Sequence, residues 1–280
     1  MNERNERRAG GTPATSWFIE TKEYRRFVEF CSACRRDRYI GLCYGPPGVG
    51  KTLSARHYAS WDLLERAFAG YRANRDPVPQ PSELERCRSV VYTPPVTVTP
   101  KQLAADLHGL RCELTWAVED ARAPGGASGV TRVRPELTEL VLVDEADRLK
   151  LATLEQLRDL YDREGFGLVL IGMPGLEKRL ARYPQLYSRV GFAHAYRPLS
   201  PEELWFILEH HWQRLDLALS REDFTDTEAV ATIARITAGN FRLVQRLFSQ
   251  IERILTINQL RTVTKEVVET ARESLVIGTG

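Results

Sequence analysis

The feature that most constrains this chain is a glycine-rich segment, residues 45–52, that directly follows a short apolar run. It reads Gly-Pro-Pro-Gly-Val-Gly-Lys-Thr and matches the phosphate-binding pattern G-x-x-x-x-G-K-[ST]. The apolar run, residues 39–44, predicts a strand, and residues 51–69 predict one amphipathic helix. Glycines permit backbone angles that a Cβ would forbid, so consecutive N–H groups can turn inward around a phosphate. This strand–loop–helix unit therefore predicts an α/β fold with a nucleotide site.

The polar residues of this segment have distinct expected roles. Lys51 is expected to reach the β- and γ-phosphates, and the Thr52 hydroxyl to be a ligand of Mg²⁺. The expected cofactors are therefore ATP and Mg²⁺. The residues expected to contact the nucleotide here are Gly45, Pro46, Pro47, Gly48, Val49, Gly50, Lys51, Thr52 and Leu53.

Length and composition set the broad class of the protein. The chain has 280 residues, 43% hydrophobic and 27% charged, which suffices for one α/β domain and a smaller appendage. No apolar stretch approaches the ~20 residues of a membrane span, and the charged N-terminus lacks the apolar centre of a signal peptide. We expect a cytoplasmic protein with no membrane partner. Because the formal net charge is only +2, affinity for nucleic acid must come from a local patch.

The cysteines and His211 are residue types that can bind metals. Five cysteines, an odd number, argue against a disulfide framework. Cys31 and Cys34 form a C-x-x-C pair, which admits a metal or redox site as well as helix packing. We favour packing, because Phe27 and Phe30 share their helical face and no second cysteine pair completes a zinc site. His211 lies on the apolar stripe of a predicted helix, so packing is expected there too.

Four further runs predict the remaining strands, at residues 89–92, 140–143, 167–172 and 192–196. The run at 140–143 is continuously apolar, as expected of a strand buried on both faces of a parallel sheet. Strands that alternate with helices imply a doubly wound, five-stranded parallel sheet, with ligands at the carboxyl ends of the strands.

Only helical patterns remain after Pro198. Residues 200–203, Ser-Pro-Glu-Glu, combine an N-cap, a proline in the first turn and a capping-box glutamate. Further helices are expected to begin near Thr225, Asn240 and Thr264. The expected organisation is a disordered tail at 1–14, an α/β nucleotide-binding domain at 15–198 and a small all-helical lid domain at 199–277.

Two carboxylates follow the apolar strand at 140–143. Asp144 suits Mg²⁺, which prefers hard oxygen ligands, and Glu145 can polarise the water that attacks the terminal phosphate. An acidic pair alone would usually be a strand end. Combined with the phosphate loop at the same edge of the sheet, it predicts hydrolysis, with Lys51 and Glu145 as catalytic residues.

Together the two motifs resemble those of AAA+ ATPases, with Gly45–Thr52 as Walker A and Leu140–Glu145 as Walker B. The resemblance covers residues 15–275. It implies that a lid arginine, here Arg242, contacts the nucleotide of its own chain. It also implies that an arginine finger, here Arg189, acts as a catalytic residue in the site of a neighbouring subunit.

One part of the family pattern is missing. Where these ATPases usually carry a polar first sensor, the strand at 167–172 ends in Ile-Gly and is followed by Met173-Pro174. We assign no residue to the sensor role and expect slow, assembly-dependent turnover.

Among AAA+ proteins, segments 143–150, 172–176 and 184–189 resemble transposition regulators of the TnsC, TniB and MuB type. That resemblance implies a homo-oligomer, a ring or helical filament, that assembles on double-stranded DNA with ATP. It would mark a target and recruit a transposase, with a target-selection adaptor as a further partner, and hydrolysis would drive disassembly. Helicase-loader-like proteins and signalling or secretion-associated AAA+ ATPases share the same core and remain the alternatives.

Basic and hydroxyl residues near the carboxyl ends of the strands are the expected DNA contacts. Lys101 opens a helix after the second strand, Thr131 and Arg132 lie in a glycine-containing connection, and Lys150 follows the carboxylate pair. Such side chains can bind phosphates without reading bases. We expect these four residues to form a DNA-binding surface in the assembly.

Overall fold

The computed structural model describes residues 18–73, 81–122 and 137–275. Its centre is an all-parallel sheet of five strands in the order β2-β3-β4-β1-β5, which confirms the predicted fold class. The predicted tail at 1–14 lies outside the described residues. The strands are β1 Ile40–Tyr44, β2 Ser89–Tyr92, β3 Leu140–Val143, β4 Gly167–Gly172 and β5 Val190–Ala195.

Burial along the strands follows their place in the sheet. Every residue of β2, β3 and β4 is buried, in keeping with their apolar sequences, whereas β5 at the edge is largely exposed. Strand β1 lies between β4 and β5, with Leu42 opposite Leu170 on one side and Ala193 on the other. The segment after β1 therefore leaves the carboxyl edge of the sheet between β4 and the edge strand β5.

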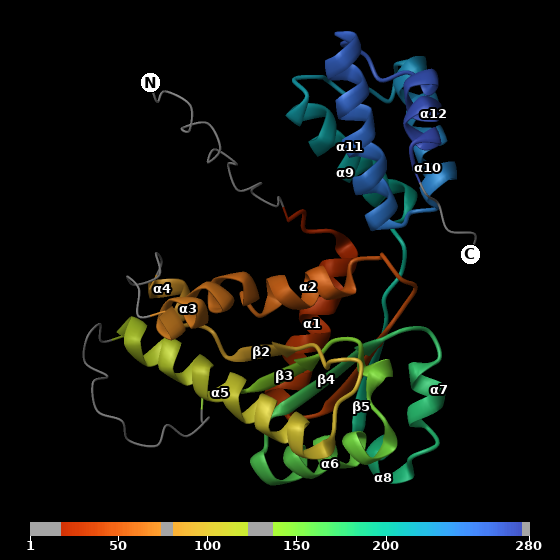
Figure 1. Cartoon of the computed structure of the whole chain (residues 1–280). Coiled ribbons are helices and arrows are strands. Elements are labelled where there is room, and N and C mark those ends of the chain that lie inside the picture. The colour runs from red at the N-terminus through yellow and green to blue at the C-terminus, as the bar shows by residue number, and fades with distance from the viewer. Residues whose placement is uncertain (1–17, 74–80, 123–136, 276–280) are drawn as a thin grey trace, which may run out of the picture.

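Helices flank this sheet (Figure 1). Helix α1 packs against β1, β4 and β5, while α5 packs against β2 and α6. The helices of this part are α1 Lys22–Asp37, α2 Lys51–Tyr58, α3 Trp61–Ala73, α4 Pro81–Leu84, α5 Pro100–Arg122, the 3-10 turn η1 Ala146–Arg148, α6 Leu151–Glu164, α7 Leu176–Leu180 and α8 Pro184–Tyr187.

The prediction of one helix over residues 51–69 was wrong. The chain breaks after α2 at Ser60, whose φ of 51° is left-handed, and restarts as α3. The Ser60 carbonyl accepts hydrogen bonds from the N–H groups of Leu63 and Leu64, so the turn itself begins the second helix. This change of direction buries Trp61 and Leu64 in the core.

The C-terminal part is helical throughout and has its own hydrophobic core, as predicted for the fold class (Figure 1). Trp212, Leu247, Phe248 and Ile251 are among its buried residues, and none of them belongs to the core around the sheet. Its helices are α9 Pro201–Arg214, α10 Phe224–Thr237, α11 Phe241–Asn258 and α12 Lys265–Glu273.

Helix caps explain where two of these helices begin. Ser200 and Glu203 form the reciprocal capping box that the sequence indicates at the start of α9. Helix α10 begins slightly earlier than expected, because the Asp223 carboxylate accepts the N–H groups of Thr225, at 2.7 Å, and Asp226, at 3.3 Å. An aspartate is a strong N-cap, and it takes that position from Thr225.

The cysteines of the C-x-x-C pair face the core. Cys31 and Cys34 are fully buried, and burial raises the pKa of the Cys34 thiol to about 12. Both thiols therefore stay neutral near pH 7. Among the helices of the described ranges, none combines the length and the apolar character that crossing a bilayer requires.

His211 should make the lid sensitive to acid. It is buried and stacks on Phe248 with ring centroids 4.2 Å apart. Burial, with added repulsion from Arg214 and His210, lowers its pKa from 6.5 to about 4. Between those two values the unfolded chain binds a proton that the folded chain excludes, so stability falls as the pH falls, by about 3 kcal/mol over the whole window.

Thermal unfolding of the His211→Leu variant from pH 7 to pH 4 measures this effect. The variant should lose the part of the pH dependence that arises between pH 6.5 and 4. His210→Gln, at the neighbouring position, should keep the pH dependence of the unaltered chain. Parallel pH profiles for the His211→Leu variant and the unaltered chain would contradict the assignment.

Candidate nucleotide site

The phosphate loop connects β1 to α2 and is shaped by two left-handed glycines. Gly48 has φ 80° and Gly50 has φ 111°. A Cβ on Gly48 would also lie 2.5 Å from Asn240 Oδ1, so this position excludes side chains twice over. Gly50 caps α2 without a side-chain hydrogen bond. The N–H groups of the first turn of α2 therefore remain available for an anion such as a phosphate.

Lys51 points its ammonium group into the loop. Its Nζ donates to the carbonyl oxygens of Gly45, at 2.6 Å, and Pro46, at 2.7 Å. Burial lowers the pKa of Lys51, and nearby Arg242 lowers it further, although Asp144 is among the groups that oppose the shift. A buried ammonium that relies on carbonyl dipoles would gain from the negative charge of a phosphate.

The two residues predicted to hold Mg²⁺ lie in contact. Thr52 Oγ1 donates to Asp144 Oδ2 at 2.6 Å, and the other carboxylate oxygen accepts the Glu145 N–H at 2.9 Å. Within the described ranges no three His, Cys, Asp or Glu side chains converge as a metal cluster, so phosphate oxygens and water would complete the coordination. This sparse set of hard oxygen donors fits Mg²⁺, which would neutralise phosphate charge when bound.

Glu145 is exposed and adopts a left-handed conformation with φ 51°. Its carboxylate forms an ion pair with Arg148, and Arg148 Nη1 also donates to the carbonyl of Pro94 at 2.9 Å. The turn of the chain after Asp144 thus directs the two acidic side chains differently. Asp144 stays buried beside Thr52, while the exposed Glu145 also lines the cavity.

These residues surround a cavity of about 400 Å³. Val49 instead packs into the core, while Gly45 and Pro46 contribute the carbonyl groups that hold Lys51. The predicted residues that line the cavity are Pro47, Gly48, Gly50, Lys51, Thr52, Leu53, Asp144, Glu145 and Arg242.

Six cavity residues were not predicted. The motifs give no signal for Arg56 or Gln245, which reach the cavity only through helix geometry. Asp147 is the third residue after Asp144, and its acidic character was the only available signal. The full additional set is Arg56, Asp147, Gly172, Met173, Phe241 and Gln245.

The lid reaches the cavity through the start of α11. The Arg242 N–H donates to the Gly48 carbonyl at 2.9 Å, and Asn240 Nδ2 donates to the Pro47 carbonyl at 2.8 Å. Asn240 also caps α11 by accepting the Leu243 N–H at 3.2 Å. The phosphate loop therefore positions the first turn of α11, and with it the Arg242 side chain that lines the cavity.

A second hollow adjoins the first and has an aromatic lining. Phe18, Tyr24 and Tyr196 line it, and it shares Leu53 and Phe241 with the phosphate cavity. With a volume of about 20 Å³ it has room for about one water molecule, so a nucleotide base does not fit there unless the lining side chains move. Thr21, Glu23 and Tyr24, at the start of α1, also belong to its lining.

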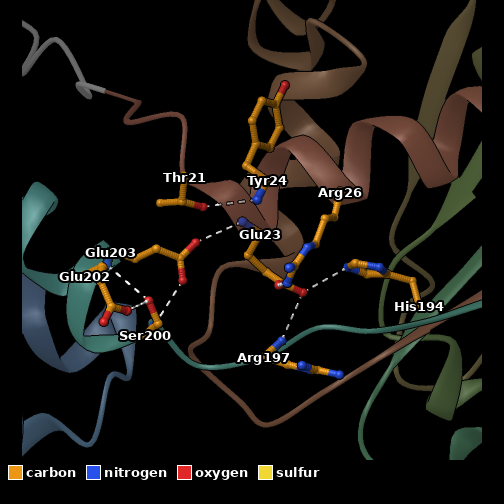
Figure 2. Close-up of polar contacts among 9 residues, drawn as sticks. All are labelled: Thr21, Glu23, Tyr24, Arg26, His194, Arg197, Ser200, Glu202 and Glu203. Carbon is orange, nitrogen blue, oxygen red and sulfur yellow. Dashed lines mark hydrogen bonds and ion pairs between the residues drawn. The ribbon is translucent and has the colours of Figure 1, made fainter.

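Glu23 connects the rim of this hollow to the lid through its backbone N–H and to the sheet through its side chain (Figure 2). The Glu23 N–H donates to Glu203 Oε1 at 2.9 Å, which joins α1 to α9. The Glu23 side chain contacts His194 at 3.2 Å and accepts the Arg197 N–H at 3.3 Å. Burial raises the pKa of Glu23, but the contacts with His194 and Arg197 outweigh it, so the pKa is lowered overall. No sequence motif indicates these contacts.

The proposed arginine finger lies away from this cavity. Arg189 Nε donates to Asp162 Oδ1 at 2.6 Å. Its carbonyl accepts the Ile40 N–H at the start of β1, which places Arg189 at the amino edge of the sheet, opposite the phosphate loop. Within one chain it therefore does not contribute to the nucleotide site.

The structure describes two of the four residues predicted to contact DNA. Both are exposed on the carboxyl side of the sheet, Lys101 in the first turn of α5 and Lys150 as the N-cap of α6. A hydrogen bond from Thr153 Oγ1 to the Val98 carbonyl, at 3.4 Å, joins the segments that carry them. Thr131 and Arg132 lie outside the described residues.

Comparisons with known proteins agree with this geometry. The AAA domain family matches residues 34–180. A "potential ATP-binding protein" of Staphylococcus aureus is 46% identical over 93% of this chain and 97% of its own length. The "ATP-dependent target DNA activator B" of Escherichia phage Mu is 29% identical to this chain. The alignment covers 64% of this chain and 51% of the phage protein.

Among solved structures, the Holliday junction branch migration motor RuvB of Thermotoga maritima superposes with a TM-score of 0.57. The alignment covers 93% of this chain and 71% of RuvB at 20% identity, so the likeness concerns the fold. With the sequence matches, it confirms the predicted resemblance to AAA+ proteins of the MuB type.

Proposed function

The chain belongs to the AAA domain family, and from that premise we propose that it is an ATP-dependent, DNA-binding regulator of DNA transposition. In this proposal it oligomerises on duplex DNA with ATP, marks a target and recruits a transposase, with a target-selection adaptor as a further partner. Hydrolysis of ATP then drives disassembly. The observation that carries the proposal is a cavity lined by the phosphate loop, Asp144 and Glu145 in a chain similar to a target DNA activator.

The nucleotide part of the proposal rests on the contacts of the cavity. Lys51 and the uncapped N–H groups of α2 would bind the phosphates, and Thr52 with Asp144 would hold Mg²⁺. Glu145, which lines the cavity, would take a proton from the attacking water. These roles require no covalent intermediate, because phosphoryl transfer depends mainly on positioning and charge neutralisation.

The assembly part rests on the separation of the two arginines. Arg242 lines the cavity of its own chain, whereas Arg189 lies at the opposite edge of the sheet. If Arg189 completes the site of a second copy, hydrolysis depends on assembly.

Mixing Arg189→Ala protein with Glu145→Gln protein tests this, since only interfaces between the two variants can pair an intact Arg189 with an intact Glu145. Restored ATPase activity in the mixture supports the proposal, and two inactive proteins that stay inactive together oppose it.

The DNA part gives a prediction for Lys101 and Lys150. Both ammonium groups are exposed on the same side of the sheet, so they can bind backbone phosphates without reading bases. Replacing both by alanine should weaken ATP-dependent binding of duplex DNA about tenfold or more and reduce the salt slope by about two. Fluorescence anisotropy over a range of salt concentrations measures both quantities.

The control for this pair is Lys265→Ala on α12. Lys265 is an exposed lysine paired with Glu228 on the lid, so its removal changes the net charge without touching the proposed DNA surface. It should leave affinity and salt slope nearly unchanged. Equal effects of the control and the double variant, or no effect of the double variant, would contradict the assignment.

A further inference from the structure

The residue at the carboxyl end of β4 has no side chain. Strand β4 ends at Gly172, which lines the phosphate cavity together with Met173. A Cβ on Gly172 would lie 2.5 Å from Asp147 Oδ2 and 3.0 Å from Asp147 Cγ. The space above this strand tip is therefore filled by a carboxylate from the turn after β3.

Two hydrogen bonds fix Asp147 in this place. Its Oδ2 accepts the Met173 N–H at 2.8 Å, and its backbone carbonyl accepts Arg179 Nη1 at 2.7 Å. Arg179 also donates to the carbonyl of Leu149, so α7 holds the whole η1 turn against the end of β4. The second carboxylate oxygen of Asp147 has no hydrogen bond to any residue of the described ranges.

Asp147 also acts electrostatically on the phosphate site. Its charge opposes the lowering of the Lys51 pKa, and both residues line the same cavity with Asp144 and Glu145. A carboxylate cannot bind a phosphate oxygen directly, because both are negative. It can accept a hydrogen bond from a water molecule that lies between them.

We propose that Asp147 positions the attacking water in ATP hydrolysis by this chain, in place of a polar side chain at the tip of β4. The inference rests on the proposed function. The water oxygen forms a bond to the γ-phosphorus while the bond to the bridging oxygen breaks, and the proton passes to Glu145. Asp147 keeps its charge and only orients the water.

The Asp147→Asn variant separates this role from a purely structural one. Its amide oxygen can still accept the Met173 N–H, but the remaining group is then an NH₂ donor, which cannot accept a hydrogen bond from water. The expected result is a kcat lowered about tenfold or more, with unchanged thermal stability. ATP should bind equally well or more tightly, because one negative charge near the phosphates is gone.

Gly172→Ala provides an independent route to the same effect. The added methyl group would displace the Asp147 carboxylate, so kcat should fall, and the double variant should lose little more than either single variant. Asp159→Asn, an ion-paired aspartate on α6 outside the cavity, is the matched control and should turn over ATP at the normal rate.

The decisive comparison measures steady-state ATPase rates and ATP affinity for the unaltered chain, Asp147→Asn and Glu145→Gln, with Mg²⁺ and duplex DNA. Loss of kcat with retained ATP affinity in Asp147→Asn supports the inference. A normal kcat in Asp147→Asn, with Glu145→Gln inactive, overturns this inference alone. An unaltered chain that binds ATP but does not hydrolyse it overturns the proposed hydrolysis and this inference together.

Discussion

Glu145→Gln should trap the protein on DNA in its ATP-bound state. Glutamine keeps the size of the side chain but cannot take a proton from water, so the hydrolysis rate should fall about 100-fold or more. ATP binding should persist, because Lys51, Thr52 and Asp144 are untouched. Loss of the exposed ion pair with Arg148 should cost less than about 1 kcal/mol of stability. ATPase assays and the lifetime of the DNA complex after dilution measure the two effects.

Glu119→Gln is the matched control for this variant. Glu119 is an exposed residue of α5 that does not line the cavity. The Glu119→Gln variant should therefore hydrolyse ATP at the same rate as the unaltered chain and stay on DNA for the same time. A Glu145→Gln protein that still hydrolyses ATP at the normal rate would contradict the role of Glu145. One that leaves DNA as quickly as the unaltered chain would contradict the link between hydrolysis and disassembly.

Lys51→Ala should have the opposite effect and abolish assembly. Lys51 is the only lysine among the described residues that line the cavity. Its ammonium group is held within the phosphate loop by the carbonyl oxygens of Gly45, at 2.6 Å, and Pro46, at 2.7 Å. Removing a charge-assisted contact to phosphate should weaken ATP binding by about 3 kcal/mol, or roughly 100-fold. Without bound ATP, the protein should remain unassembled when duplex DNA is added. Titration with a fluorescent ATP analogue measures the affinity.

Lys178→Ala, an exposed lysine on α7, controls for the loss of one positive charge. It should bind ATP normally. Normal ATP affinity in Lys51→Ala would contradict the assignment of the phosphate site. The two variants should change the assembly on DNA in opposite directions. Lys51→Ala protein should remain unassembled, and Glu145→Gln protein should remain assembled.

The sequence was sufficient to place β2, β3 and β4 because these strands are strongly patterned. The apolar runs that became β2, β3 and β4 are short, continuous and bounded by turn residues, so their positions follow from burial on both faces. The phosphate loop was equally predictable, since its pattern is fixed by backbone geometry at Gly48 and Gly50. Local rules of this kind need no knowledge of distant contacts.

What the sequence did not predict depends on contacts between distant segments. Asp147 reaches the tip of β4 only because β3 and β4 are neighbours and Gly172 leaves room. Asn240 meets the phosphate loop across 193 positions of sequence, and Glu203 meets α1 across 180. The break between α2 and α3 was missed because Ser60, unlike glycine, gives no warning of a left-handed backbone.

Electron microscopy of the full chain can show whether ATP controls its assembly on DNA. With duplex DNA and a non-hydrolysable ATP analogue, we expect rings or helical filaments on the DNA. Without nucleotide, or with Lys51→Ala protein, we expect bare DNA. A protein that saturates with the analogue yet stays monomeric and off the DNA would contradict the proposal.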